Sequence, residues 1–162
     1  MASFTVKGPF EVPSQKLVKS QYITSAEGKK FWLAHKVVAK ERGCYAFAFR
    51  ASKGFVPIYV GKATKSFEQE VFTSHKLVKY NQGLQSRSKG TLVLFFVPLT
   101  KSKGPINKVA IDEVESYLIQ AGLAANKSLL NSKKTKQESW SIRGGSGKSS
   151  EAANDFRKCL SI

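Results

Sequence analysis

Two short β-rich segments in the middle of the chain constrain its fold more than any other feature. Residues 44–49 and 55–60 are rich in aromatic and aliphatic side chains, and the connection between them, residues 51–54, contains a glycine. Two such segments joined by a short glycine-containing loop are typical of an antiparallel hairpin. Pro57 cannot donate a ladder hydrogen bond, so the second strand is expected at a sheet edge, or it begins near Ile58.

The hairpin lies between segments with helical periodicity. The predicted helices cover residues 25–40, a segment starting after Ser66, residues 106–121 and residues 150–160, and short strands are predicted at 91–97 and 140–142. Ser25 and Ser66 are suitable N-caps, and Gly122 is expected to end the third helix. At 162 residues this α+β order of elements fits a single domain covering 1–162.

The charge of the chain indicates the kind of partner. The sequence has 27 Lys and Arg against 11 Asp and Glu, a net charge of +16. Such an excess repels itself in the folded state and favours a polyanionic partner. Nucleic acid is the first candidate, an anionic membrane surface is the minor one, and a basic structural protein of a nucleoprotein particle is a third possibility.

Other features of the sequence bear on the location. It contains no apolar run of about 18 residues and no secretory signal, so neither a membrane span nor secretion is expected. Cys44 and Cys159 lie far apart and do not suggest a disulfide framework. A reducing, cytoplasmic location is therefore expected.

Two tripeptides stand at matching places in the two hairpin strands. Residues 43–45 (GCY) open the first strand, and residues 59–61 (YVG) close the second. Glu115 follows in a later helix, and Asn131 comes after it. In this order and spacing, the region 43–131 resembles the GIY-YIG nuclease superfamily.

The resemblance implies a small three-stranded antiparallel sheet flanked by helices, with the active site on the exposed face of the sheet. Residues 43–131 would be the core, residues 1–42 an N-terminal extension with a helix, and residues 132–162 a C-terminal helical appendage. It also implies a metal-dependent endonuclease that hydrolyses phosphodiester bonds, with DNA favoured over RNA. A catalytically inactive nucleic-acid-binding domain on the same fold is the alternative, and either a monomer or a homodimer is compatible.

The residues of the family's active site map onto particular positions here. Glu115 would hold a single Mg²⁺ or Mn²⁺. Tyr45 would help to deprotonate the attacking water, with Tyr59 as the alternative base. Tyr59 and Lys62 would contact the phosphate. Because the metal would stabilise the leaving oxygen, these groups together account for a hydrolysis.

Further positions follow from the same resemblance. His75, or Ser74 by strict spacing, stands near the place of a family residue that acts on the attacking water or the leaving group. Asn131, with Asn126 as the competing candidate, would tie the loop after the glutamate helix to the sheet. The positions with a structural role are Gly43, Gly61 and Asn131.

The sequence departs from the family at Glu70, where an arginine usually contacts the phosphate. Lys62 could supply the missing charge, or Glu70 could join Glu115 as a second carboxylate ligand of the metal. In the third account the site has lost its activity and only binding remains. The first account, alone or with the second, is favoured.

Without the resemblance, the same residues allow plainer interpretations. Tyr45 and Tyr59 are equally compatible with core aromatics whose hydroxyls reach water. Glu115 lies at the border of the apolar stripe of its helix, where an acid must be paired or liganded, and a salt bridge to a lysine is the alternative to a metal. His35 lies outside the motif and is interpreted as structural.

Basic residues cluster in sequence around the expected site. Those expected to bind nucleic acid are Lys65, Lys76, Lys79, Lys133 and Lys134. Scattered, solvated lysines are the alternative. Trp140 and Tyr80 could stack on an unpaired base, although burial is the commoner outcome. Residues 143–149 resemble a nucleotide-binding P-loop, but Ile142 occupies the place of its first glycine, so ATP or GTP binding is not expected.

Overall fold

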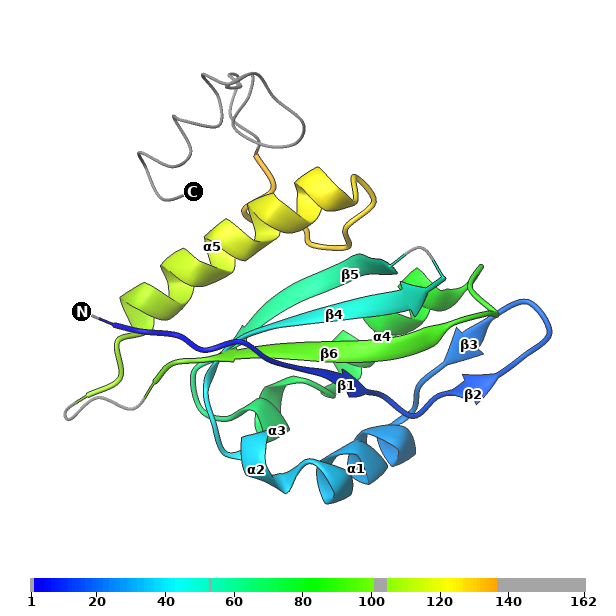
Figure 1. The fold of residues 1–162 in the computed structure, drawn as a ribbon, viewed down its shortest axis with the longest axis horizontal. Coiled ribbons are helices and arrows are strands. Elements are labelled where there is room, and N and C mark those ends of the chain that lie inside the picture. The colour runs from blue at the N-terminus through cyan, green and yellow to red at the C-terminus, as the bar shows by residue number, and fades with distance from the viewer. Residues whose placement is uncertain (1, 53, 101–104, 137–162) are drawn as a thin grey trace.

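The computed structural model describes residues 2–52, 54–100 and 105–136 (Figure 1). The strand expected at 140–142 and the helix expected at 150–160 lie outside the described residues, as do Trp140 and the glycine-rich segment 143–149. The described part has an α+β fold in which helices pack against an antiparallel sheet.

Four antiparallel strands form the central sheet, in the order β1-β6-β4-β5. Its strands are β1 (Lys7–Glu11), β4 (Gly43–Ala51), β5 (Gly54–Ala63) and β6 (Thr91–Pro98). A separate two-stranded ribbon joins β2 (Gln15–Lys16) to β3 (Gln21–Tyr22). The three expected strands are present, but the expected three-stranded sheet is wrong, because the N-terminal segment adds β1 at one edge.

The sequence of β1 has no alternating pattern that would predict a strand. All five of its residues are exposed or partly exposed, and its register with β6 shifts between Lys7 and Phe10. Phe10 still packs on the core, with its ring centroid 5.6 Å from that of Phe96. Ile23 and Phe31 belong to the same core, so residues 2–42 pack into one body with the region that follows them.

The predicted hairpin is confirmed. β4 and β5 pair across a tight turn, and Gly54 closes it with a φ of +113°, a conformation that favours glycine. β5 is an edge strand, as the proline in its sequence predicts. The register shifts between Phe47 and Ala48, and Ala48 pairs with Pro57. The third predicted strand, β6, is also confirmed.

Two of the predicted helices are each interrupted and form two shorter helices in the structure. They are α1 (Ser25–Ala34), α2 (Lys36–Ala39), α3 (Phe67–Glu70), α4 (Ser74–Leu84) and α5 (Lys108–Ala125). The first expected helix breaks at His35, whose backbone leaves the helical region with a φ of −123°. The second breaks before α4, where Thr73 is extended. Periodicity does not locate such breaks when apolar residues continue across them.

The helix ends are also partly different. Thr24, rather than Ser25, caps α1, and it forms a capping box with Glu27. The hydrogen bond from the Thr24 hydroxyl lowers the pKa of the buried Glu27 from 4.5 to about 2. Ser66 caps α3 as predicted. Gly122 does not end the last helix, because it is buried inside α5.

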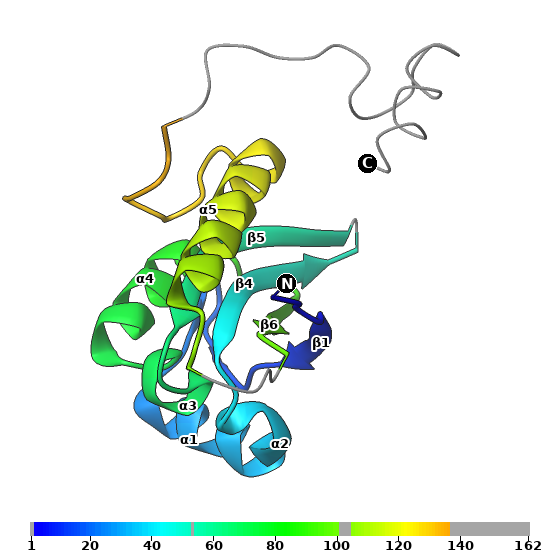
Figure 2. The same ribbon diagram turned by 90° about the vertical axis from the view of Figure 1, so that its left-hand side faces the viewer.

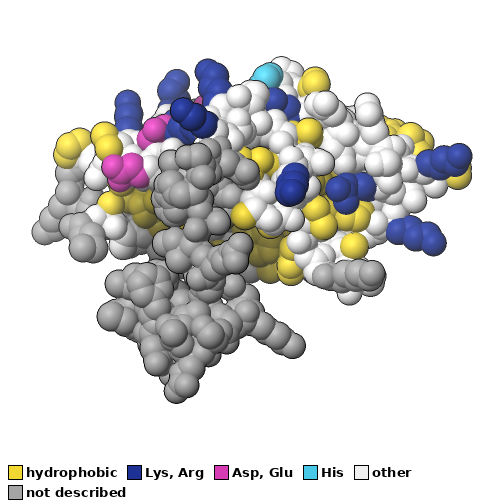
Figure 3. Space-filling view, turned by 90° about the horizontal axis from the view of Figure 1, so that it is seen from above, with side chains coloured by type: hydrophobic (Ala, Val, Ile, Leu, Met, Phe, Trp, Pro, Cys, Tyr) yellow, Lys and Arg dark blue, Asp and Glu magenta, His cyan; other side chains and the backbone are white. Residues whose placement is uncertain are grey.

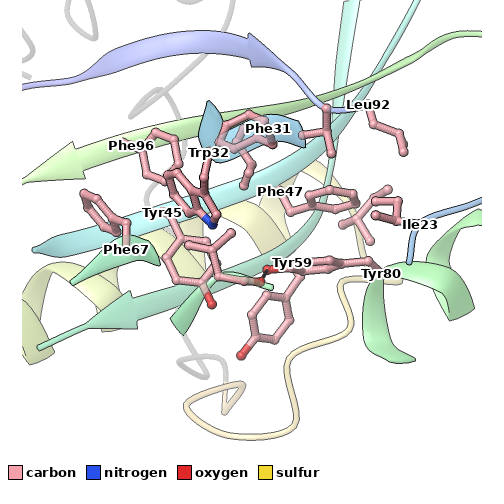
Figure 4. Packing of buried hydrophobic residues seen from close by; sticks show 14 of the residues in the cluster. Ile23, Phe31, Trp32, Tyr45, Phe47, Tyr59, Phe67, Tyr80, Leu92 and Phe96 are labelled. Atoms are coloured by element: carbon pink, nitrogen blue, oxygen red, sulfur yellow. Dashed lines mark hydrogen bonds between the residues drawn. The ribbon is translucent and has the colours of Figure 1, made fainter. Parts of the chain in front are cut away.

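Alternation along the strands divides their side chains between two layers. Tyr45, Phe47 and Tyr59 belong to the large aromatic core that packs against α1, α3 and α4 (Figure 4). Val60 packs against Ile119 of α5, which lies against β5 and β4 (Figure 2). Neighbours in sequence such as Tyr59 and Val60 therefore project into different layers, and this decides how the candidate site is built.

Candidate active site at the edge strand

The two glycines of the tripeptides lie so close to neighbouring atoms that a larger residue would collide with them. Tyr45 pairs with Gly61, and a Cβ atom on Gly61 would lie 2.5 Å from both Cζ and Oη of Tyr45. The phenol therefore crosses the edge strand over the glycine. Gly43 has a φ of +149°, and a Cβ there would lie 2.3 Å from the carbonyl oxygen of Val97. A side chain at either position would collide with a closely packed neighbour.

The hydroxyl of Tyr45 is buried without a partner. The residue is 0% exposed, and no described residue lies in hydrogen-bonding geometry with this hydroxyl. The Tyr80 hydroxyl is near, but it donates to the carbonyl oxygen of Val71 at 2.8 Å. Burial, with a smaller effect from the nearby Tyr59, raises the pKa of Tyr45 well above its ordinary value, although the neighbouring Tyr80 hydroxyl partly opposes this rise. Tyr45 is therefore a neutral phenol in the free protein.

Tyr59 lies beside Tyr45, and its hydroxyl accepts a hydrogen bond from the ammonium group of a lysine. The two ring centroids are 6.4 Å apart, and both hydroxyls point away from Phe96 (Figure 4). Lys76 Nζ donates a hydrogen bond to the Tyr59 hydroxyl at 2.5 Å. Lys79, on the same helix, has its Nζ 6.0 Å from the centroid of the Tyr59 ring. Helix α4 thus brings two cations to the tyrosine pair.

Two carboxylates and two ammonium groups form a cluster on the α5 side of β5. Lys134 Nζ lies 2.7 Å from Asp112 Oδ1 and 2.8 Å from Glu115 Oε2. Lys62 Nζ contacts the same oxygen of Asp112 and lies 3.2 Å from the same oxygen of Glu115. The two acids, one turn apart on α5, therefore contact the same pair of ammonium groups. The Glu115 side chain is only 13% exposed there.

The lysines and the burial of this region set its protonation states. The hydrogen bonds from Lys134 and Lys62 lower the pKa of Asp112 from 3.8 to about 2, so it is ionised at neutral pH. The thiol of Cys44 donates to the carbonyl oxygen of Ile111 at 3.3 Å. Burial, together with the charge of the nearby glutamate on α5, raises the pKa of Cys44 to about 12. This thiol is therefore no nucleophile at neutral pH.

The strand β5 separates the tyrosines from the acid cluster. Tyr45 and Tyr59 face the core under α1, α3 and α4, whereas Lys62 contacts Glu115 on the α5 side. The structure thus differs from the expected arrangement, in which the tyrosines and the glutamate converge on one exposed sheet face. The two groups instead flank the edge strand. They are close enough for the Glu115 charge to add to the effect of burial on the pKa of Tyr45.

Other expected site residues lie around this edge. Glu70 ends α3 and is partly exposed, with no ion pair to any other described residue. His75 is exposed in the first turn of α4 and hydrogen-bonds to none of the described side chains. Lys65 and Lys133 are exposed as well. Seen from above, acidic side chains gather beside Lys and Arg on this side of the molecule (Figure 3). His35, by contrast, packs on the core, with its ring 4.6 Å from that of Phe31.

The segment after α5 covers part of the β5 edge. The Asn131 side chain accepts a hydrogen bond from the Val60 amide at 3.0 Å and donates one to the Val60 carbonyl oxygen at 2.8 Å. Asn126 donates to the carbonyl oxygen of Pro57 at 2.7 Å. Both asparagines therefore tie this segment to the edge strand, and their contacts stop directly before Gly61.

Two features of the site were missed from the sequence. Asp112 is not among the expected residues, although it stands three positions before Glu115 and so shares its helix face. The bond between Lys76 and Tyr59 joins residues 17 positions apart on different elements. Spacing along the chain gives no signal for such a contact.

The acid pair suits a hard divalent cation. Mg²⁺ and Mn²⁺ prefer carboxylate oxygens, and Mg²⁺ usually keeps several water ligands beside one or two carboxylates. Asp112 and Glu115 already direct one oxygen each toward the same ammonium group, that of Lys134. Among the described residues there is no group of three or more His, Cys, Asp and Glu side chains that could hold a metal. Two carboxylates, both paired with lysines in this structure, are thus what the described residues at this site offer a cation.

Comparisons with protein-family models, curated proteins and solved structures find no match. Within the described residues, no helix is both long enough and apolar enough to cross a membrane.

Proposed function

We propose that this chain is a divalent-metal-dependent endonuclease that hydrolyses phosphodiester bonds in nucleic acid, with DNA as its first substrate. The observation that carries the proposal is the unpartnered hydroxyl of Tyr45, held at the edge strand by Gly61. A buried hydroxyl without a partner lowers stability, and a functional role is one explanation for such a group. The other unpartnered buried side-chain atom among the described residues, Trp32 Nε1, belongs to α1 rather than to the tripeptide strands. The net charge of +16 supports a polyanionic ligand.

Tyr45 would act on the phosphate as a hydrogen-bond donor. The raised pKa of Tyr45 does not suit the expected role of a base in the free protein, but a neutral phenol can donate to a phosphate oxygen. Tyr59, whose ring lies beside that of Tyr45, would act through the lysine ammonium group that its hydroxyl holds. Donors that are fixed before the substrate arrives stabilise the charge that develops in the transition state.

Glu115, with Asp112 beside it, would hold the Mg²⁺ or Mn²⁺. When bound, the cation supplies positive charge to the leaving oxygen and lowers the pKa of a water. Lys62 and Lys134 now neutralise the two carboxylates, so at least one ammonium group would move away from them as the metal binds. A lysine released in this way could then bind a neighbouring phosphate of the substrate.

The same ion pairs favour a second candidate, a catalytically inactive nucleic-acid-binding domain. If Lys62 and Lys134 stay bound to Asp112 and Glu115, the acid pair is satisfied without a metal. Glu70, where an arginine was expected, supports this alternative. Binding would then depend on the exposed lysines around the edge strand.

Plasmid nicking at low salt tests the proposal. Wild type, Glu115→Gln and Glu113→Gln would be compared with Mg²⁺, with Mn²⁺ and with EDTA. Glu113 is an exposed acid on the same helix and serves as the matched control. The proposal expects metal-dependent cutting that Glu115→Gln loses and Glu113→Gln keeps. Binding without cutting in either metal, on duplex, single-stranded and branched substrates, would leave the inactive binding domain.

A further inference from the structure

The lysines around the β5 edge differ in what their ammonium groups bind. Lys62 and Lys134 are paired with carboxylates on α5. Lys76 instead donates to the hydroxyl of Tyr59, so its positive charge has no carboxylate partner among the described residues.

The position of Lys76 is fixed by its surroundings. Its acceptor, Tyr59, is only 7% exposed, so the phenol ring is held by the core. Lys79 is fixed separately, because its Nζ donates to the carbonyl oxygen of Leu130 at 3.3 Å. The Lys76 ammonium is therefore a positioned cation rather than a freely moving surface charge.

The groups beside this cation are all suited to one kind of ligand. The unpartnered hydroxyl of Tyr45 belongs to the ring next to Tyr59, 6.4 Å away between centroids. An ammonium group and hydroxyl donors that point the same way match the oxygens of a phosphate. A carboxylate ligand on a protein partner would use the same donors, but the net charge of +16 favours a polyanion with repeated phosphates.

We infer that Lys76 binds the phosphate at which the nucleic-acid strand is cut. Tyr59 is the positioning residue that fixes the Lys76 ammonium group. This inference rests on the proposed function. It identifies a cation for the phosphate other than the two lysines that are paired with Asp112 and Glu115. It also makes Glu70 compatible with activity, because the positive charge comes from α4 rather than from α3.

Two measurements on the full chain test the inference. One is single-turnover cleavage of a labelled DNA duplex in Mg²⁺ at saturating protein, and the other is binding of the same duplex in EDTA over a series of salt concentrations. The variants are Lys76→Met, Lys76→Arg, Tyr59→Phe and the double variant Lys76→Met/Tyr59→Phe. Lys30→Met removes one exposed lysine of α1 and controls for lost charge, and thermal melts confirm that each variant folds.

Lys76→Met is expected to lower the saturated cleavage rate about 100-fold, the typical effect of removing one preorganised group that stabilises transition-state charge. It should also lower the slope of log affinity against log salt by about 0.9, the value for one lost phosphate contact on duplex DNA. Lys76→Arg should restore part of both. Lys30→Met should change neither. Because Tyr59 is expected to act through Lys76, the double variant should be no worse than Lys76→Met.

Two results would overturn the inference. One is a Lys76→Met variant that behaves like Lys30→Met, and the other is an additive effect of Tyr59→Phe in the double variant. If the wild type binds but never cuts, the proposed nuclease fails, and the salt slope in EDTA alone decides whether Lys76 binds a phosphate.

Discussion

Replacing Tyr45 by phenylalanine should make the protein more stable and less active at the same time. The side chain is 0% exposed and its hydroxyl has no partner among the described residues. Tyr45→Phe keeps the ring, which packs near Tyr59 and Phe67 with centroids 6.4 Å away in each case. It removes a hydroxyl that is buried on folding without gaining a hydrogen bond from any described residue.

The size of the effect follows from this burial. A buried polar group left without a partner lowers stability by about 1–3 kcal/mol. Removal of the hydroxyl should therefore raise the free energy of unfolding by up to about 1–3 kcal/mol. In a chain of 162 residues each 1 kcal/mol corresponds to a rise in Tm of about 2–4 °C. Cleavage should fall about 100-fold, as for other lost transition-state donors.

Tyr80→Phe is the matched control. Tyr80 is equally buried, but its hydroxyl donates to the Val71 carbonyl oxygen at 2.8 Å. Its removal leaves that oxygen unpaired and should lower the free energy of unfolding by about 1–3 kcal/mol. Urea denaturation of both variants, followed by tryptophan fluorescence, measures the two changes. If Tyr45→Phe loses as much stability as Tyr80→Phe, the Tyr45 hydroxyl has a partner in solution and the reasoning is refuted.

Three further predictions concern the same fold. Gly61→Ala should lower the free energy of unfolding by about 1–3 kcal/mol in urea titrations, because its Cβ would lie 2.5 Å from the Tyr45 phenol; an unchanged midpoint would contradict this packing. Lys134→Met should strengthen Mn²⁺ binding up to about fivefold, because the metal no longer has to displace an exposed ion pair of about 1 kcal/mol. Lys133→Met should leave Mn²⁺ binding unchanged. Electron paramagnetic resonance of free Mn²⁺ measures both affinities. Glu27, with its pKa lowered from 4.5 to about 2, stabilises the fold above its unfolded pKa, and this contribution is lost as the pH falls from about 4.5 to about 2. Glu27→Gln should flatten that part of the curve of Tm against pH, and a parallel curve would count against the capping box.

The hairpin and β6 could be predicted because their signals are local. A glycine-containing loop between two apolar, β-rich segments leaves few alternatives, and the apolar run of β6 is buried as expected. β1 could not be predicted in this way, because its place in the sheet depends on pairing with residues more than 80 positions later, such as Lys7 with Phe96. The break at His35 likewise depends on packing, since its ring lies 4.9 Å from that of Phe10 in β1.

The candidate site could be predicted only in part, for a related reason. The tripeptides and the later helix select Tyr45, Tyr59 and Glu115 as candidates, and the structure places all three around β5. Their layers depend on strand alternation, which places Tyr59 and Lys62, three positions apart, on opposite faces of β5. The partner of Glu115, Lys134, comes from a turn whose backbone has a φ of +60°, and the sequence around it gives no signal for that conformation.

An edge strand allows groups from both faces of a sheet to act on one ligand. In a central strand, the neighbouring strands would keep the tyrosines and the acid pair apart. β5 has a neighbour on one side only, and the contacts of Asn131 and Asn126 with its other side stop before Gly61. A strand of nucleic acid that lies along this part of the edge would meet the phenols from one layer and the carboxylates from the other. Gly61 is the position on which both the fold and the proposed chemistry depend, because a Cβ atom there would lie 2.5 Å from the Tyr45 hydroxyl.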